Sequence, residues 1–344
     1  MIPRERVHRM LRFQSVDKPV LDCDINAVGI YEHGEKLRDL LRSLDSDFGP
    51  VSEKRFDLPK PEDFDQNDHY LVYSSDEWGV VWEQKIFGVM GHPYKRPLDD
   101  WSQLDNYKFP HQEPWTSEIL EEKKIKIEAL KNQGYFTRRG WIKYIELTYA
   151  LRSFEDVLMD IALYDEDVLR FTDRLHAYNR LTVKNWIEAG TDCIQFADDL
   201  GTQKSLLISP QCFRNIYKPR LKELVDIVKK AGKYAFFHTC GYALPLLEDI
   251  KEIGFDGIWP QLNVYDLHEL VHQCRELKLA ISIHPERSKL MTTGKPEEIR
   301  KRIYEYNEIF RPEDGGAWYY LEIDNGFPYE NIVSMVETIR ELRT

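Results

Sequence analysis

From residue 191 onward, short apolar runs alternate with amphipathic segments, and this alternation constrains the fold more than any other feature. The apolar runs are TDCIQFAD, YAFFH, DGIWP, LAISIH and AWYYLEI. They lack the polar and apolar alternation of a strand with one solvated face. Helical patterns separate or follow them at residues 210–231, 244–253, 267–277, 296–310 and 329–342. Strands buried on both faces and joined by helices are typical of a parallel α/β sheet.

Earlier segments extend this pattern toward the N-terminus. Strands are predicted at residues 19–25 and 134–142, an amphipathic helix within residues 1–16, and two helices between 154 and 190. The α/β pattern predicts a (β/α)8 TIM-type barrel, with an open doubly wound sheet as the alternative. No GxGxxG or GxxxxGK[ST] phosphate turn, which would favour the open sheet, occurs in the sequence.

Residues 27–133 interrupt the strand and helix rhythm. The segment is rich in proline and aromatic residues, as in DEWGVVWEQ and GHPYKRPLDDW, and contains a solvated helix at 121–130. We interpret it as an irregular insertion or cap of short strands and loops. The whole chain, 1–344, is then a single barrel domain that carries this insertion.

The net charge and the cysteine pattern exclude several classes of function and predict the cellular compartment. Lys and Arg total 47 against 59 Asp and Glu, a net charge of −12, which argues against a nucleic-acid partner or an anionic membrane. No apolar run approaches the roughly 20 residues of a membrane span. The 5 cysteines are irregularly spaced and no apolar signal segment is present. We expect a reduced, cytoplasmic protein that acts on a small molecule.

In a barrel, the carboxyl ends of the strands face one bowl, and here they carry many polar side chains. Asp198 and Asp199 begin a polar turn that either acts in catalysis or caps a helix, although Ser209 already supplies that cap. Arg138 and Arg139 can clamp a carboxylate or neutralise the acidic bowl. The other candidates are Asp22, Cys23, Asp24, His238, Cys240, Gln261, His284, Glu322, Asp324 and Asn325.

His238 and Cys240 end the run KYAFFHTCG, residues 233–241. Two ligand types at the mouth of one strand can converge on a metal ion. The alternative is a small hydrophobic Cys beside a hydrogen-bonded His. Cys240 could also act as a nucleophile with His238 as its base, but residues two apart on a strand suit shared ligation better.

A second pattern, HELVH at residues 268–272, matches the H-E-x-x-H motif of zinc proteases. The apolar residues around it, Leu270, Val271 and Cys274 among them, predict a core-packing helix that leaves both His on its solvated side. We therefore interpret the match as coincidental.

Beyond these single motifs, the order and spacing of several segments resemble the uroporphyrinogen decarboxylase superfamily. The segments are PRERVHRMLRFQSVDKPV, the run from FADDLGTQKS to GIWPQLN, KPEEIRKRI and GFPYENIVSM, so the likeness is weakest over 27–133. The resemblance implies a (β/α)8 barrel with its site at the carboxyl ends of the strands. The decarboxylases carry an arginine-rich loop after the first strand, where this chain has the acidic Asp22 and Asp24.

The resemblance is nearer to the zinc methyltransferases of that superfamily, whose ligands are His-x-Cys and a later Cys. His238 and Cys240 match the first two, and the later Cys is absent. We expect His284 to complete the metal site, with Glu286 or Glu322 as alternatives. The implied reaction moves a methyl group between a small substrate and a corrinoid on a partner protein, for which the rim of the bowl would be a docking surface.

We also expect catalytic or substrate-binding roles for the other polar residues at or near the strand ends. We expect Asp198, Asp199 and Glu322 to act in catalysis. Substrate contacts are expected from Asp22, Asp24, Arg138, Arg139, Gln203 and Gln261. The alternatives are a decarboxylase-type lyase acting on a tetrapyrrole or other polycarboxylate, and a non-catalytic ligand-binding barrel.

Overall fold

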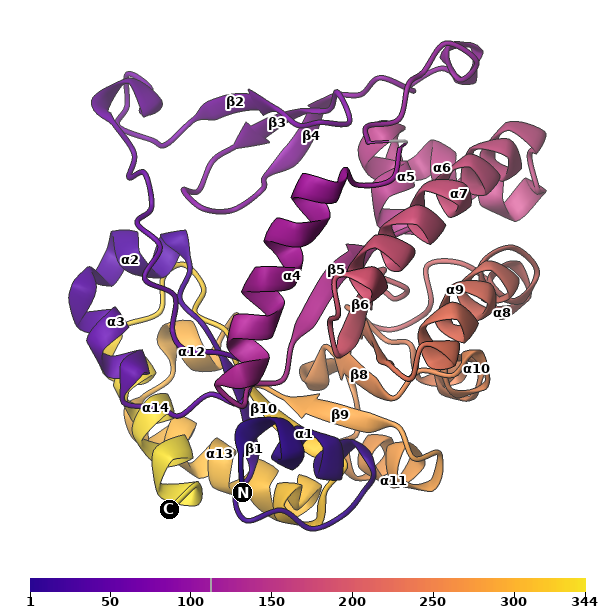
Figure 1. The fold of residues 1–344 in the computed structure, drawn as a ribbon. Coiled ribbons are helices and arrows are strands. Elements are labelled where there is room, and N and C mark those ends of the chain that lie inside the picture. The colour runs from indigo at the N-terminus through magenta and orange to yellow at the C-terminus, as the bar shows by residue number, and fades with distance from the viewer. Residues whose placement is uncertain (112) are drawn as a thin grey trace.

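A curled parallel sheet forms the centre of the computed structural model, which describes residues 1–111 and 113–344 (Figure 1). Its strands lie in the spatial order β1-β10-β9-β8-β7-β6-β5, and every neighbouring pair is parallel. They are β1 (Val20–Cys23), β5 (Arg138–Ile142), β6 (Cys193–Ala197), β7 (Tyr234–Thr239), β8 (Gly257–Pro260), β9 (Ala280–Ile283) and β10 (Ala317–Leu321). Each coincides with a predicted strand, and the α/β class is confirmed.

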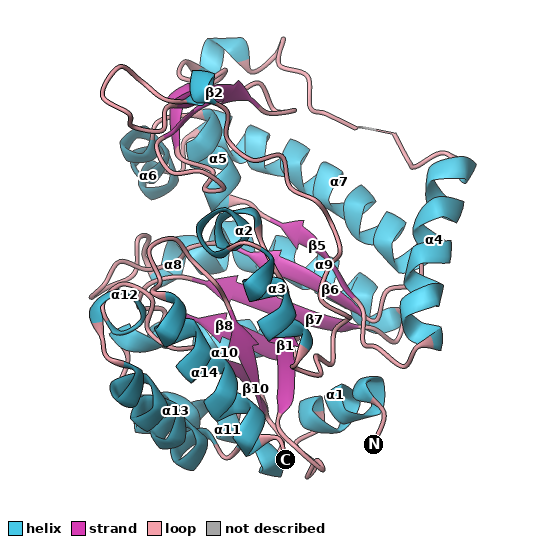
Figure 2. Ribbon diagram, turned by 90° about the vertical axis from the view of Figure 1, so that its left-hand side faces the viewer, coloured by secondary structure: helices cyan, strands magenta, loops and turns pink. Residues whose placement is uncertain are grey.

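Helices surround this sheet (Figure 2). Those predicted from amphipathic patterns are α1 (Pro3–Leu11), α4 (Ser117–Asn132), α6 (Phe154–Leu163), α7 (Glu166–Glu188), α9 (Lys218–Lys230), α10 (Leu247–Ile253), α11 (Leu267–Glu276), α13 (Pro296–Phe310) and α14 (Tyr329–Leu342). Further helices are α2 (Ala27–His33), α3 (Glu35–Arg42), α5 (Ile145–Leu151), α8 (Pro210–Cys212) and α12 (Leu290–Thr293). Within the described residues, we find no helix with the length and apolarity that a membrane span requires.

Two helices illustrate how well the patterns predicted packing. Helix α13 buries Ile299, Ile303, Tyr306 and Phe310, which lie three or four residues apart. Helix α11 buries Leu270, Val271 and Cys274 and leaves His268 and His272 exposed. The HELVH motif therefore lies on a solvated helix face, as predicted.

The sheet has seven strands in the described part of the chain rather than the predicted eight, and β1 and β5 are its two edges. Asp47 bridges them through its backbone. Its N–H donates to the carbonyl oxygen of Leu21 at 2.8 Å, and its own carbonyl accepts from the N–H of Phe136 at 3.0 Å. A single residue therefore links the two edges where an eighth strand would complete a barrel.

Residues 27–133 are more ordered than the irregular insertion predicted, and only Gln112 lies outside the described residues. The segment contains α2, α3, α4 and an antiparallel sheet of β2 (Val72–Ser75), β3 (Val81–Gln84) and β4 (His92–Lys95). This sheet lies opposite the two termini (Figure 1). The ring of Trp78 packs on Tyr178 of α7, with centroids 4.9 Å apart, which fastens the sheet to the barrel.

Candidate metal centre

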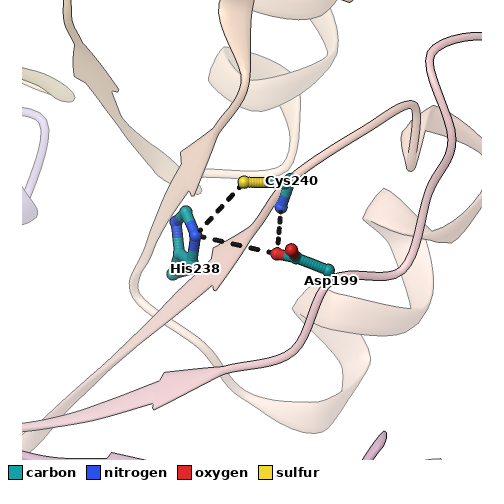
Figure 3. A group of neighbouring side chains, drawn as sticks. All are labelled: Asp199, His238 and Cys240. Carbon is teal, nitrogen blue, oxygen red and sulfur yellow. Dashed lines mark hydrogen bonds and ion pairs between the residues drawn. The ribbon is translucent and has the colours of Figure 1, made fainter. Parts of the chain in front are cut away.

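Three ligand side chains meet at the carboxyl ends of β6 and β7. Asp199 follows β6, while His238 and Cys240 lie at the end of β7, and their ligand atoms all lie within 4.8 Å of one another (Figure 3). Ala197 pairs with His238 in the parallel register, so both strands end at the same level of the sheet. Among residues 1–111 and 113–344, this is the one such group of three His, Cys, Asp or Glu side chains.

The contacts inside this group are short. Cys240 Sγ lies 3.5 Å from His238 Nε2, and Asp199 Oδ1 lies 3.8 Å from the same nitrogen. The backbone N–H of Cys240 donates to Asp199 Oδ1 at 2.9 Å. One nitrogen, one sulfur and one oxygen donor thus point at a common position (Figure 3).

The hydrogen bonds of His238 fix which of its nitrogens is free. Nδ1 lies 3.0 Å from the carbonyl oxygen of Trp259, which can only accept, so Nδ1 carries the proton. Burial lowers the pKa of His238 to about 4, so the ring is neutral at pH 7. Nε2 therefore presents a lone pair to the group, which is the form that binds a metal ion.

The pKa of Cys240 is shifted in the opposite direction to that of His238. Burial, followed by the negative charge of Asp199, raises the pKa of the Cys240 thiol to about 12. The group without a cation therefore holds a protonated thiol, and a bound cation would supply the charge that releases this proton. Zinc accepts nitrogen, sulfur and oxygen ligands in one tetrahedral site, so this donor set fits zinc.

Asp199 stands in the group where His284 was expected. His284 is buried after β9, with Nε2 2.8 Å from the carbonyl oxygen of Pro260 and Nδ1 3.4 Å from that of Pro285. The alternatives are also engaged elsewhere. Glu286 accepts the N–H groups of the turn leading into α12, and Glu322 forms an ion pair with Arg287 at 3.0 Å.

Asp198 lies beside the group and supports a neighbouring turn. Its buried carboxylate accepts the N–H groups of Tyr144 at 2.8 Å and Glu146 at 2.9 Å, which fixes the start of α5. Burial raises the pKa of Asp198 well above its usual range. These contacts assign Asp198 a positioning role in this structure.

Gln261 and Gln203 support the loop that follows Cys240. The side-chain oxygen of Gln261 accepts the N–H of Gly241 at 2.9 Å and lies 3.3 Å from the side-chain nitrogen of Gln203. Both predicted substrate contacts therefore support the loop beside Asp199, His238 and Cys240, which we call the candidate metal group.

A cavity of about 300 Å³ is lined by the carboxyl ends of β1 and β10 and by Arg138 and Arg139, which begin β5 rather than end it as predicted. The predicted residues Asp22, Asp24, Arg138, Arg139 and Glu322 all line it. Asp22 is buried and pairs with Arg138 at 2.6 Å. Burial raises the pKa of Asp22 and that of Glu322, and the positive charges of Arg138 and Arg287 act against that rise.

Two residues near the group were not predicted. Trp141, 45% exposed, stacks on the His238 ring with centroids 5.7 Å apart, and its position at the carboxyl end of a predicted strand was an available signal. Glu146 raises the pKa of both His238 and Cys240 by its charge, against the burial that lowers the former. It lies on α5, a helix that the sequence pattern did not reveal.

Comparison with known proteins identifies the family. A sequence model for uroporphyrinogen decarboxylase (URO-D) matches residues 146–342, more than half of the chain. This chain belongs to that family. The resemblance read from the sequence motifs is confirmed, and the match includes Asp199, His238 and Cys240. No curated protein matches the sequence.

One solved structure shares the fold of this chain. A methyltransferase from Methanosarcina mazei aligns over 100% of both chains with a TM-score of 0.64 and 17% identity, which shows a shared fold. A glycosylated endo-beta-1,4-xylanase from Gloeophyllum trabeum has 8% identity and a TM-score of 0.44 over 68% of this chain and 83% of its own. A dihydropteroate synthase from Coxiella burnetii has 12% identity and a TM-score of 0.34 over 46% and 59%. The last two TM-scores lie too low to indicate a shared fold.

Proposed function

We propose that this member of the uroporphyrinogen decarboxylase family is a zinc-dependent methyltransferase, which moves a methyl group between a small substrate and a corrinoid on a partner protein. The observation that carries the proposal is the convergence of Asp199, His238 and Cys240 within 4.8 Å. The fold shared with a Methanosarcina mazei methyltransferase agrees with it. All 5 cysteines are free thiols, in keeping with a reducing cytoplasm.

The three side chains would hold the zinc ion, and each is oriented by a neighbour. The Trp259 carbonyl holds the His238 ring through Nδ1 and leaves Nε2 free to bind. Asp199 is held at Oδ1 by the N–H of Cys240. The Cys240 thiol gives up its proton on binding. When bound, zinc supplies a Lewis acid that lowers the pKa of a thiol or hydroxyl at its open position.

The decarboxylase alternative receives less support from the same region. A substrate with several carboxylates needs several cationic partners. Arg138 is neutralised by Asp22 and Arg287 by Glu322, which leaves Arg139 as the arginine lining the cavity without an acidic partner among the described residues. A non-catalytic barrel remains the outcome if zinc and methyl transfer are both absent.

Zinc content tests the proposal. Protein purified without a metal-affinity tag is expected to carry about one zinc ion per chain by elemental analysis. Asp199→Ala, His238→Ala and Cys240→Ser should each lose most of it. The double variant His268→Ala/His272→Ala, which removes the exposed pair on α11, should keep it. Zinc retained in the first three variants, or lost in the control, would contradict the assignment.

Methyl transfer is tested with methylcobalamin as the corrinoid and 2-mercaptoethanol as the acceptor. The thiolate takes the methyl group and cob(I)alamin leaves, which the absorption spectrum reports. We expect zinc-loaded wild type to accelerate the reaction and His238→Ala to fall at least about 100-fold, as for removal of one essential catalytic group. Equal rates for the zinc-free and zinc-loaded protein would sink the proposal.

A further inference from the structure

Adjacent arginines on β5 have different environments. Arg138 forms an ion pair with the buried Asp22 at 2.6 Å, and its guanidinium lies 5.1 Å from the Phe48 ring centroid. Arg139 donates from Nη1 to the carbonyl oxygen of Arg138 at 2.7 Å. Within residues 1–111 and 113–344, no acidic side chain pairs with Arg139. The two arginines therefore do not form one clamp, because only Arg138 is neutralised.

Arg139 is costly to keep in this position. It is half-buried, and burial followed by the charge of Arg138 lowers its pKa. A desolvated charge beside a like charge destabilises a fold unless something else requires it. Residues that break such local rules are concentrated at functional sites.

Arg139 lines the cavity of about 300 Å³, where its charge is accessible to a ligand. Two of the cavity's carboxylates have cationic partners, Asp22 with Arg138 and Glu322 with Arg287, while Asp24 accepts the backbone N–H of Ser52 at 2.9 Å. Arg139 is the lining guanidinium that no described carboxylate pairs with. An incoming carboxylate would supply the partner that this guanidinium lacks.

Aromatic rings connect this cavity to the metal group. Tyr320 lines the cavity and its ring centroid lies 4.3 Å from that of Trp259. Trp259 in turn lies 4.2 Å from the ring centroid of His238. The cavity and His238 thus flank one pair of aromatic side chains. A small molecule anchored at Arg139 can extend along this pair toward His238.

We propose that Arg139 alone, without Arg138, binds the carboxylate of the substrate, and that the substrate is a monocarboxylate anchored in the cavity beside the metal group. This inference rests on the proposed function for the role of the metal group. Guanidinium matches carboxylate through two parallel hydrogen bonds, which Arg139 has free to offer. Arg138 positions Asp22 and does not contact the substrate.

Benzoate and its neutral analogue benzamide test this assignment by isothermal titration calorimetry. Wild type should bind benzoate at least about tenfold more tightly than benzamide. Arg139→Gln should lose that preference, Arg139→Lys should keep part of it, and the exposed control Arg340→Gln should keep all of it. An Arg139→Gln protein that binds benzoate as wild type does, or a wild type without the preference, would overturn the proposal.

Melting temperatures separate a binding arginine from a structural one. Arg139→Gln should melt at or above the wild-type temperature, because it removes an unbalanced charge. Arg138→Gln should melt several degrees lower, because it leaves Asp22 buried without its partner. Equal losses in both variants would show that Arg139 is structural.

Zinc analysis of the same samples keeps this inference distinct from the proposed function. Zinc-free protein that still prefers benzoate through Arg139 contradicts the metal assignment alone. Zinc-loaded protein without the preference contradicts the anion site alone.

Discussion

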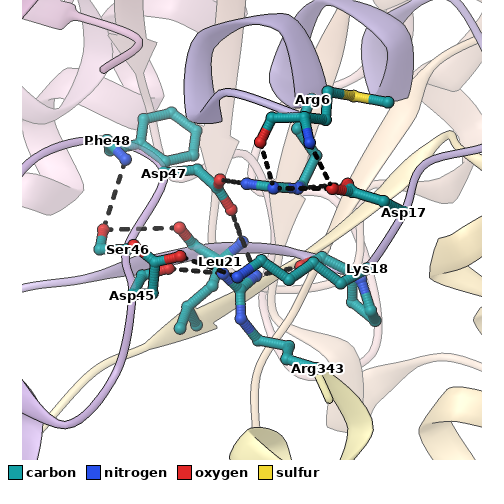
Figure 4. Close-up of polar contacts among 11 residues, drawn as sticks. Arg6, Asp17, Lys18, Leu21, Asp45, Ser46, Asp47, Phe48 and Arg343 are labelled. Atoms are coloured by element: carbon teal, nitrogen blue, oxygen red, sulfur yellow. Dashed lines mark hydrogen bonds and ion pairs between the residues drawn. The ribbon is translucent and has the colours of Figure 1, made fainter. Parts of the chain in front are cut away.

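The backbone of Asp47 joins the two open edges of the sheet, and its side chain connects further elements around the β1 edge (Figure 4). Asp47 is 0% exposed, and its Oδ1 accepts a hydrogen bond from Arg6. Its Oδ2 lies 3.2 Å from Arg343 Nη1 and accepts the N–H of Leu21 at 2.8 Å. One carboxylate thus connects α1, β1 and the end of α14.

Asp47→Asn should cost about 3–5 kcal/mol of unfolding free energy, because it leaves two buried guanidinium groups without their shared anion. Asp45→Asn is the matched control two residues away. Asp45 is 63% exposed and pairs with Lys18, so its loss should cost no more than about 1 kcal/mol. Urea denaturation at pH 7 measures both. Similar costs for the two variants would show that the buried network does not close the sheet.

The three candidate metal ligands show how far residue types alone can identify a site. His238 and Cys240 were predictable because both end one apolar run, and strand geometry places them together. Asp199 was predicted near the site but not as a ligand, because its contact with Cys240 depends on how two loops cross. The orientation of His284 toward the Pro260 carbonyl is likewise a tertiary contact that no local pattern encodes.

The loops after β6 and β7 cross at two glycines, and this crossing brings Asp199 to Cys240. Gly201 N–H donates to the Cys240 carbonyl at 3.3 Å, and Tyr242 N–H donates to the Thr202 carbonyl at 2.7 Å. Gly241 has φ of +72°, and a Cβ there would lie 1.9 Å from the Gly201 carbonyl oxygen. A side chain at Gly241 therefore separates the two loops.

Gly241→Ala should lose most bound zinc and destabilise the protein by more than Gly232→Ala does. Gly232, after α9, also has a positive φ of +68°, but a Cβ there meets nothing within 4 Å. The control should cost about 1–2 kcal/mol, the price of a left-handed backbone with a side chain, and should keep its zinc. Elemental analysis with urea denaturation tests both. Full zinc content in Gly241→Ala would show that the crossing does not position the ligands.

Helices and strands whose own sequence shows a clear apolar pattern were predicted. Those whose ends are fixed by contacts with distant segments were not. Six of the seven barrel strands follow from apolar runs, β5 being the exception, and α14 begins and ends where its pattern does. Helix α5 has only 7 residues, and Asp198 from another strand fixes its start. Helices α2 and α3 have 7 and 8 residues, too short for a clear period.

The molecule as a whole is closed at the amino-terminal ends of its strands by α1. Val7 and Met10 pack against Phe136, Phe236 and Trp318 in one buried cluster. An eighth strand was predicted from the alternation of strands and helices, with which the family resemblance agreed, because most barrels close by strand pairing. Here a single residue and a helix complete the closure, and sequence periodicity does not report such a contact.

An ion pair fastens α1 to the barrel and should make this closure sensitive to pH. Arg4 of α1 pairs with the buried Asp192 at 2.8 Å, and Asp192 also accepts the N–H and hydroxyl of Thr137 at 3.1 Å. Burial raises the pKa of Asp192, but Arg4 and Thr137 outweigh it and hold the pKa below the usual 3.8. A carboxyl group with a depressed folded pKa stabilises the fold above its unfolded pKa, and this stabilisation is lost as the pH falls through the folded value.

Asp192→Asn should therefore cost about 2 kcal/mol at pH 7 and progressively less as the pH falls below 3.8, where wild type loses the same interaction. Urea denaturation at pH 7 and at several acidic pH values measures the difference. Arg4→Gln should reproduce part of this loss at pH 7, and the double variant should cost less than the two single losses combined, because both remove one pair. Hydrogen exchange should show α1 opening first on acidification. A cost of Asp192→Asn that stays constant with pH would contradict the role of its charge in holding α1 across the barrel.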